Sequence, residues 1–194
     1  MNNNIYDSEY PYGCREIDLK AYNKENTGLG VLCQFSKGDI LDENERKKIF
    51  KNIKSGCKEK KVWALLGGTE KNQWICLQVA SASNISEEII SDIKCMLPIT
   101  SKDTRPWKSQ FHEKVFVVQY GLDVRCQKYR DMFERFSSFS IIIIEPKTYL
   151  KDSNNIYNSV KYAEVKYAYD TQALYWNAIK EEHEILRKIQ QKQE

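Results

Sequence analysis

Hydrophobic and polar positions along the chain switch between the two-residue period of strands and the longer period of helices. Short apolar runs predict strands at 29–35, 62–66, 74–79, 115–120 and 141–144. Apolar residues at helical spacing predict helices at about 43–55, 86–97 and 124–136, with one or two more from about residue 155 onward. The predicted class is therefore α/β, with a mixed β-sheet flanked by helices and a long C-terminal helical segment.

Two groups of neighbouring elements predict how the sheet is connected. The runs 62–66 and 74–79 are separated by a polar, glycine-containing loop, which indicates a β-hairpin. Four successive isoleucines at 141–144 predict a central strand that is covered on both faces. Strand 115–120, helix 124–136 and this isoleucine strand together predict a right-handed βαβ unit with parallel strands.

Residues at the ends of the first helix indicate where it begins and stops. Asp42 is a typical N-cap, and Glu45 has the spacing of a capping box. Gly56 follows the last apolar position and predicts a left-handed stop. For the next helix, Asn84 or Ser86 is the predicted cap.

The chain has 194 residues, which predicts a single domain over 29–194 preceded by an irregular N-terminal arm over 1–28. No apolar run approaches the roughly 18 residues of a membrane span, and the first residues lack the pattern of a secretory signal. We therefore expect a cytoplasmic protein with no membrane partner. The six scattered cysteines lack the close pairs of a zinc site, so we expect them to be small buried hydrophobes.

A cluster of basic residues is the clearest charge feature. The net charge is only +3, from 30 basic and 27 acidic residues, and does not by itself indicate a nucleic-acid partner. The cluster comprises Arg46, Lys47, Lys48, Lys51, Lys54, Lys58, Lys60 and Lys61. On the solvent side of the first helix and the loop after it, these side chains predict a positive stripe that binds phosphates of DNA. The alternative interpretation is an ordinary solvated helix face.

Acidic residues near two strand ends suggest a metal site. Glu145 and Lys147 follow the isoleucine strand, and Asp123 follows the run 115–120. If the strands are parallel, these side chains meet at one edge of the sheet, where two carboxylates suit Mg²⁺ or Mn²⁺. The alternative is that Asp123 caps a helix while Glu145 and Lys147 form a polar strand exit. A second Glu-x-Lys at 164–166 falls on a predicted helix, where we expect a solvated face.

The order acid, then Glu-x-Lys, resembles the motif of PD-(D/E)xK nucleases. The resemblance implies that Asp123 and Glu145 bind the metal ion and that Lys147 stabilises the scissile phosphate. A helix lies between Asp123 and Glu145, where that family usually has a hairpin.

A second resemblance covers residues 62–97. Strand 62–66, a loop, strand 77–81 and the Ser83-Asn84-Ile85 start of a helix resemble the core of a GIY-YIG nuclease. That family has catalytic tyrosines on the two strands and an arginine on the helix. This chain has Ala64 and Gln78 where the tyrosines are expected, and Glu87 or Glu88 in place of the arginine. The resemblance therefore implies a degenerate hairpin that serves as scaffold or binding surface.

Two functional hypotheses follow from these features. The first is a small metal-dependent nuclease acting on DNA, of the kind found in restriction or defence systems. The second is a non-catalytic module of nuclease-like fold that binds nucleic acid, a nucleotide or a protein. A protein partner that docks on the C-terminal helix around Ile185, Leu186 and Ile189 is a further option. The chain lacks the glycine motifs of P-loop, Rossmann and α/β-hydrolase enzymes.

Overall fold

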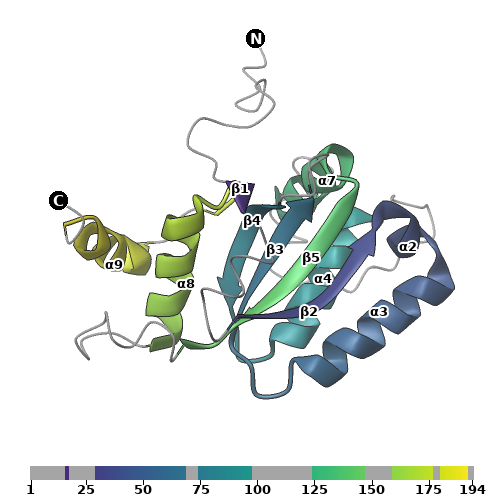
Figure 1. Cartoon of the computed structure of the whole chain (residues 1–194), viewed down its shortest axis with the longest axis horizontal. Coiled ribbons are helices and arrows are strands. Elements are labelled where there is room, and N and C mark those ends of the chain that lie inside the picture. Colours follow the sequence, from purple (N-terminus) through teal and green to yellow (C-terminus); the bar gives the residue numbers. More distant parts are fainter. Residues whose placement is uncertain are drawn as a thin grey trace, which may run out of the picture.

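A computed structural model describes residues 16–17, 29–68, 74–97, 124–146, 159–176 and 180–191. These residues contain one five-stranded sheet with the order β1-β4-β3-β5-β2 (Figure 1). Its strands are β1 (Glu16–Ile17), β2 (Leu29–Ser36), β3 (Val62–Gly68), β4 (Trp74–Ser81) and β5 (Ser138–Ile144). The predicted hairpin is confirmed, because β3 pairs with β4 in antiparallel register.

The isoleucine strand β5 lies inside the sheet, between β3 and β2, as its composition predicts. Ile141 and Ile143 are buried on one face, and Ile142 and Ile144 on the other. Both neighbours of β5 run antiparallel to it, so the predicted parallel pairing of β5 is not found. An apolar run indicates two covered faces but does not determine the direction of the neighbouring strands. The expected strand 115–120 lies outside the described residues.

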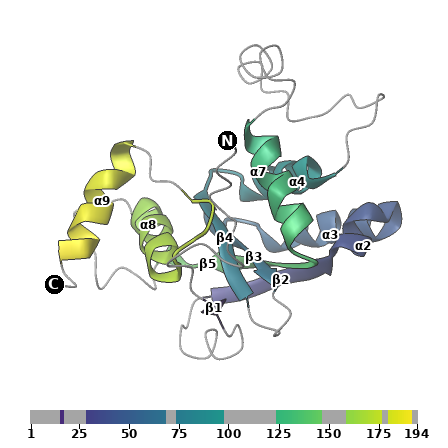
Figure 2. The ribbon, with the colours of Figure 1, turned by 90° about the horizontal axis from the view of Figure 1, so that it is seen from above.

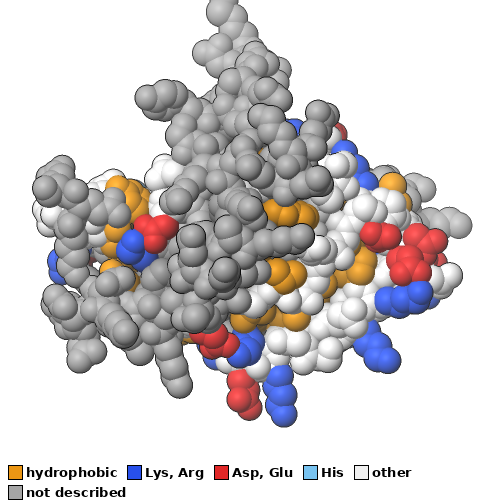
Figure 3. Space-filling view, in the orientation of Figure 1, with side chains coloured by type: hydrophobic (Ala, Val, Ile, Leu, Met, Phe, Trp, Pro, Cys, Tyr) orange, Lys and Arg blue, Asp and Glu red, His pale blue; other side chains and the backbone are white. Residues whose placement is uncertain are grey.

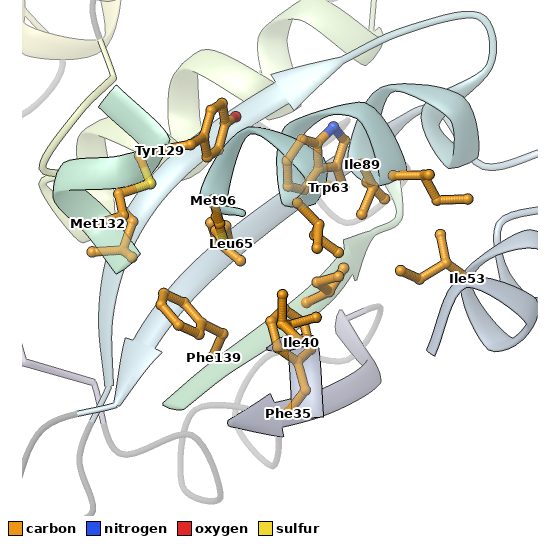
Figure 4. Packing of buried hydrophobic residues seen from close by; sticks show 14 of the residues in the cluster. Phe35, Ile40, Ile53, Trp63, Leu65, Ile89, Met96, Tyr129, Met132 and Phe139 are labelled. Atoms are coloured by element: carbon orange, nitrogen blue, oxygen red, sulfur yellow. The ribbon is translucent and has the colours of Figure 1, made fainter. Parts of the chain in front are cut away.

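Helices cover the two faces of the sheet (Figure 2). On one face lie α2 (Lys37–Leu41), α3 (Glu43–Gly56), α4 (Ile85–Met96) and α7 (Val124–Arg135). Their apolar side chains pack on those of the strands, with Trp63, Leu65 and Phe139 in the centre (Figure 4). On the other face, α8 (Ser159–Thr171) packs on β4 and β3, and α9 (Lys180–Gln191) packs on α8. The α/β class with a C-terminal helical segment is therefore confirmed.

The ends of α3 agree only in part with the sequence prediction. Asp42 caps α3 as predicted, because its Oδ1 accepts hydrogen bonds from the amides of Asn44 and Glu45 at 2.8 and 2.9 Å. The predicted stop at Gly56 is wrong: this glycine is the last helical residue, and the left-handed residue is Glu59, with a φ of 62°. The sequence pattern did not predict the short helix α2, which begins with a capping box between Ser36 and Asp39.

The chain that leaves α8 connects the two layers. The helix ends at a left-handed Gln172, and the amides of Leu174 and Tyr175 then donate to the Cys76 and Leu77 carbonyls of β4 at 2.9 and 2.8 Å. Tyr175 belongs to the core on the opposite face from α8, where its hydroxyl donates to Asp131 of α7. The segment therefore passes around the β4 side of the sheet and joins both helical layers.

Candidate nucleic-acid interface

Helix α3 separates an apolar face from a basic one. Ile49 and Ile53 are buried against the sheet, one helical turn apart. Lys47, Lys51 and Lys54 repeat at spacings of four and three residues on the opposite side of the helix, and all three are exposed. The sequence prediction of a basic stripe that faces solvent is consistent with this geometry. We call Lys47, Lys51, Lys54 and Lys58 the lysine stripe.

The residues at the N-terminal half of α3 already have partners. Lys47 pairs with Glu43 and Lys48 with Glu45, both at 2.6 Å and both largely exposed. The Arg46 guanidinium donates to the Ile40 carbonyl at 2.7 Å, which anchors α2 to α3. Exposed pairs along a helix contribute little and are screened by salt, so they are readily exchanged for another anion.

Two lysines in the second half of α3 and one in the loop after it are different. Lys51, Lys54 and Lys58 are exposed, and no carboxylate or other partner contacts their ammonium groups within the described residues. Lysine and arginine side chains project along the lower right edge of Figure 3, over α3 and the loop that follows it. These three cations are the part of the predicted stripe that is free for a ligand.

The last two basic residues of the cluster are held by neighbouring elements. Lys60 forms an ion pair with Glu145, just after β5. Lys61 donates to the Ser83 carbonyl at 2.7 Å, at the start of α4. Both contacts follow from the sheet. Val62 pairs with Ile144, which brings the entry to β3 beside the exit from β5, and it also pairs with Ser81, which brings the same entry beside the exit from β4.

Only one residue of the predicted metal site lies within the described residues. Glu145 lies at the sheet end as expected, but its carboxylate contacts Lys60. Asp123 and Lys147 lie outside the described residues. Among the residues that the structure does describe, no group of three or more histidine, cysteine, aspartate or glutamate side chains is arranged to hold a metal ion. The site at Asp123, Glu145 and Lys147 therefore stays a prediction.

A buried polar cluster is the feature that the sequence interpretation missed. Glu164 lies on a helix, as predicted, but only 5% of it is exposed, so the expected solvated face is wrong at this position. Its Oε2 accepts from Ser81 Oγ at 2.5 Å and from Lys161 Nζ at 2.9 Å. Lys161 also donates to the buried Glu182 of α9 at 2.8 Å. Burial raises the pKa of the Glu164 carboxyl above its ordinary value.

The two motif positions of the β3–β4 hairpin, where we expect a degenerate GIY-YIG core, are packed inside the fold. Trp63 and Ala64, in the first motif, are almost fully buried. Gln78, in the second, accepts a hydrogen bond from Lys128 of α7 at 2.9 Å. Beside this contact, the Tyr129 hydroxyl donates to the buried Asp92 at 2.5 Å and links α7 to α4.

Cysteine chemistry is suppressed at the positions described. Cys33, Cys57, Cys76 and Cys95 form no disulfide, and the last three are buried, in agreement with the predicted role of small hydrophobes. Burial raises the pKa of the Cys33 thiol to about 12 and that of Cys57 to about 11. At neutral pH these thiols therefore stay protonated and are poor nucleophiles.

The apolar residues of α9 are used within the chain. Ile185 and Ile189 are buried against α8, and Leu186 packs beside them. Partner binding through these three side chains, as one hypothesis has it, requires α9 to leave α8. None of the helices in the described ranges has the length and apolar character needed to cross a bilayer.

Comparison with known proteins adds no relative: neither family models, nor curated proteins, nor solved structures gave a match to this chain.

Proposed function

We propose that this protein binds the phosphate backbone of nucleic acid through the lysine stripe of α3 and the loop after it. The observation that carries the proposal is the set of three exposed cations, Lys51, Lys54 and Lys58, without a carboxylate partner in the described part of the chain. Such cations exchange their counterions for phosphates, which supplies affinity independent of sequence.

The side chains on this surface favour the backbone over the bases. Lysine is a compact charge on a flexible stem and suits single phosphate contacts. The aromatic residue of α3, Phe50, is half-buried, and the Lys94 ammonium lies 5.8 Å from its ring centre. Its ring is therefore not offered to an unpaired base, and we expect little preference for base sequence.

The stripe is tested with a matched pair of double variants. Lys51→Gln/Lys54→Gln removes two charges from α3, and Arg187→Gln/Lys188→Gln removes two from α9, at the other end of the molecule (Figure 1). Binding of a labelled DNA duplex is followed by fluorescence anisotropy over about 50 to 200 mM KCl. The slope of log K against log salt is negative. We expect it to become less steep by about 1.8 in the α3 variant and to stay unchanged in the α9 variant.

Two results of the binding experiment contradict the proposal, and a third, from competition with polyglutamate, contradicts nucleic acid as the ligand. One is that the wild-type chain does not bind duplex or single-stranded DNA or RNA at the lowest salt. The other is that both double variants change the slope equally, because binding then follows net charge rather than the stripe. If polyglutamate displaces DNA as effectively as an equal charge of unlabelled DNA, the ligand is an acidic protein instead.

The metal-dependent nuclease remains a separate prediction, with Mg²⁺ or Mn²⁺ bound by Asp123 and Glu145. It is tested by incubating DNA with the protein and either ion. In that mechanism Glu145→Ala abolishes cleavage with the fold intact, whereas cleavage that is unchanged in Glu145→Ala removes the assignment.

A further inference from the structure

The ion pair between Lys60 and Glu145 lies at the end of the proposed binding surface. Lys60 belongs to the same loop as Lys58, and its amide donates to the Cys57 carbonyl at 3.1 Å, which closes the turn after α3. Glu145 directly follows β5. Their side chains are 37% and 41% exposed, so solvent and dissolved anions reach both groups.

The sheet holds these two groups together. Val62 and Ile144 are paired across β3 and β5, so the residues just before β3 and just after β5 are neighbours. The carboxylate reaches Lys60 from there, while Lys58 in the same loop extends into solvent without a partner among the described residues. Of these two lysines of one loop, Lys60 therefore already contacts an anion and Lys58 does not.

We propose that the Glu145 carboxylate occupies Lys60 in place of a backbone phosphate and so weakens the nucleic-acid site at this end. The inference rests on the proposed function, since it assigns a regulator to the same surface. A carboxylate and a phosphate offer the same kind of oxygen acceptor to an ammonium group. An ion pair at this exposure is weak enough for a phosphate to compete with it, but each competing phosphate must first displace Glu145.

In this proposal the Glu145 carboxylate lowers the affinity for nucleic acid, and neutralising it leaves the Lys60 ammonium free to bind a phosphate. Glu145→Gln keeps the size and the hydrogen-bonding oxygen of the side chain but removes its charge. We expect the variant to bind duplex DNA with a Kd about threefold lower or better at moderate salt. The salt slope is expected to steepen by about 0.9, the value for one further phosphate contact.

Glu59→Gln is the matched control. Glu59 is an exposed carboxylate in the same loop, and it has no ion-pair partner among the described residues. Its neutralisation changes the net charge by the same amount without freeing a lysine. A second variant, Glu145→Gln/Lys60→Gln, removes the freed cation again and is expected to lose the gain. Thermal unfolding of each variant shows whether the fold is retained.

The outcomes separate this inference from the function on which it rests. If the wild type binds DNA and Glu145→Gln gains no more affinity than Glu59→Gln, the proposed effect of Glu145 is wrong and the binding function stands. If the gain persists in Glu145→Gln/Lys60→Gln, Lys60 is not the group that was freed, and the inference is also wrong. If neither wild type nor Glu145→Gln binds DNA at low salt, both proposals fail together.

Discussion

Glu164 and Glu182 approach one ammonium group, that of Lys161, from two different helices. Their residues are 5% and 3% exposed, so the carboxylates are shielded from water by α8, α9 and β4. Both buried carboxylates contact this ammonium group, and the charged form of Glu164 carries the cost of desolvation. That cost raises its pKa, although the hydrogen bonds from Ser81 and Lys161 act in the opposite direction.

The raised pKa of Glu164 predicts a stability that depends on pH. Between the ordinary glutamate value and the raised value, the folded chain holds a proton that the unfolded chain has lost. The contribution of Glu164 to the free energy of unfolding is therefore largest at acidic pH and falls as pH rises through this window, by about 1.4 kcal/mol per unit of pKa difference. We expect Glu164→Gln, which cannot ionise, to lack this fall.

Urea unfolding of the two proteins at a series of pH values measures the effect. Glu184→Gln serves as the control, because Glu184 is an exposed residue of α9. A difference between wild type and Glu164→Gln that stays constant with pH would show that Glu164 has an ordinary pKa in the fold.

At the scale of elements, sequence patterns predict structure well where the cause is local. The capping of α3 by Asp42 and the burial of Ile85, Ile89 and Ile93 on α4 depend on residues within one or two turns. Direction and pairing depend on residues far apart. The antiparallel pairing of β5 joins residues from 72 positions apart (Gly67 with Phe139, 139 − 67) to 115 positions apart (Leu29 with Ile144, 144 − 29). Lys60 and Glu145 are 85 positions apart. Periodicity does not report contacts at such separations.

In the candidate site, too, the sequence shows local features but not the contacts between distant segments. The basic cluster is visible in the sequence, whereas which of its members already have partners is known only from the structure: Lys47 pairs with Glu43 within α3, and Lys60 pairs with Glu145 across the sheet. Glu164 carried one usable signal. It stands four residues after Val160 and three before Tyr167, within the apolar stripe of its helix, where a carboxylate is expected to need a buried partner.

Gly67, near the end of β3, lets the Phe136 ring that follows α7 pack closely on the sheet. A Cβ added at Gly67 would overlap the Phe136 ring, which follows α7 and is 4% exposed. The ring cannot swing aside without leaving the core. We expect Gly67→Ala to lower the free energy of unfolding by about 1 to 3 kcal/mol, the usual cost of overpacking.

Urea denaturation followed by circular dichroism tests this contact, with Gly30→Ala of β2 as the control. A Cβ at Gly30 meets nothing within 4 Å, so we expect a change of no more than about 0.5 kcal/mol. If the two alanine variants are equally stable, close packing is not the reason for glycine in β3.

At the scale of the whole molecule, the segment after α8 joins two helical layers that the sheet otherwise separates. The amides of Leu174 and Tyr175 bind β4, and the Tyr175 side chain continues to the opposite face, where it donates to Asp131. Tyr175 is 7% exposed, so the hydroxyl binds its partner largely away from solvent. This one residue therefore couples the α8–α9 layer to the core beneath α7.

We expect Tyr175→Phe to lower the free energy of unfolding by about 1 to 2 kcal/mol, because the hydrogen bond to Asp131 is lost while the ring stays in place. Tyr169→Phe removes a hydroxyl that has no partner among the described residues, and a change within about 0.5 kcal/mol is expected.

Hydrogen exchange then shows where the stability is lost. If Tyr175 couples the layers, amides of α8 and α9 exchange at lower free energy in Tyr175→Phe, while those of β3 and β5 follow global unfolding. Equal exchange throughout both layers would mean that the remaining contacts suffice and that Tyr175 is not the link.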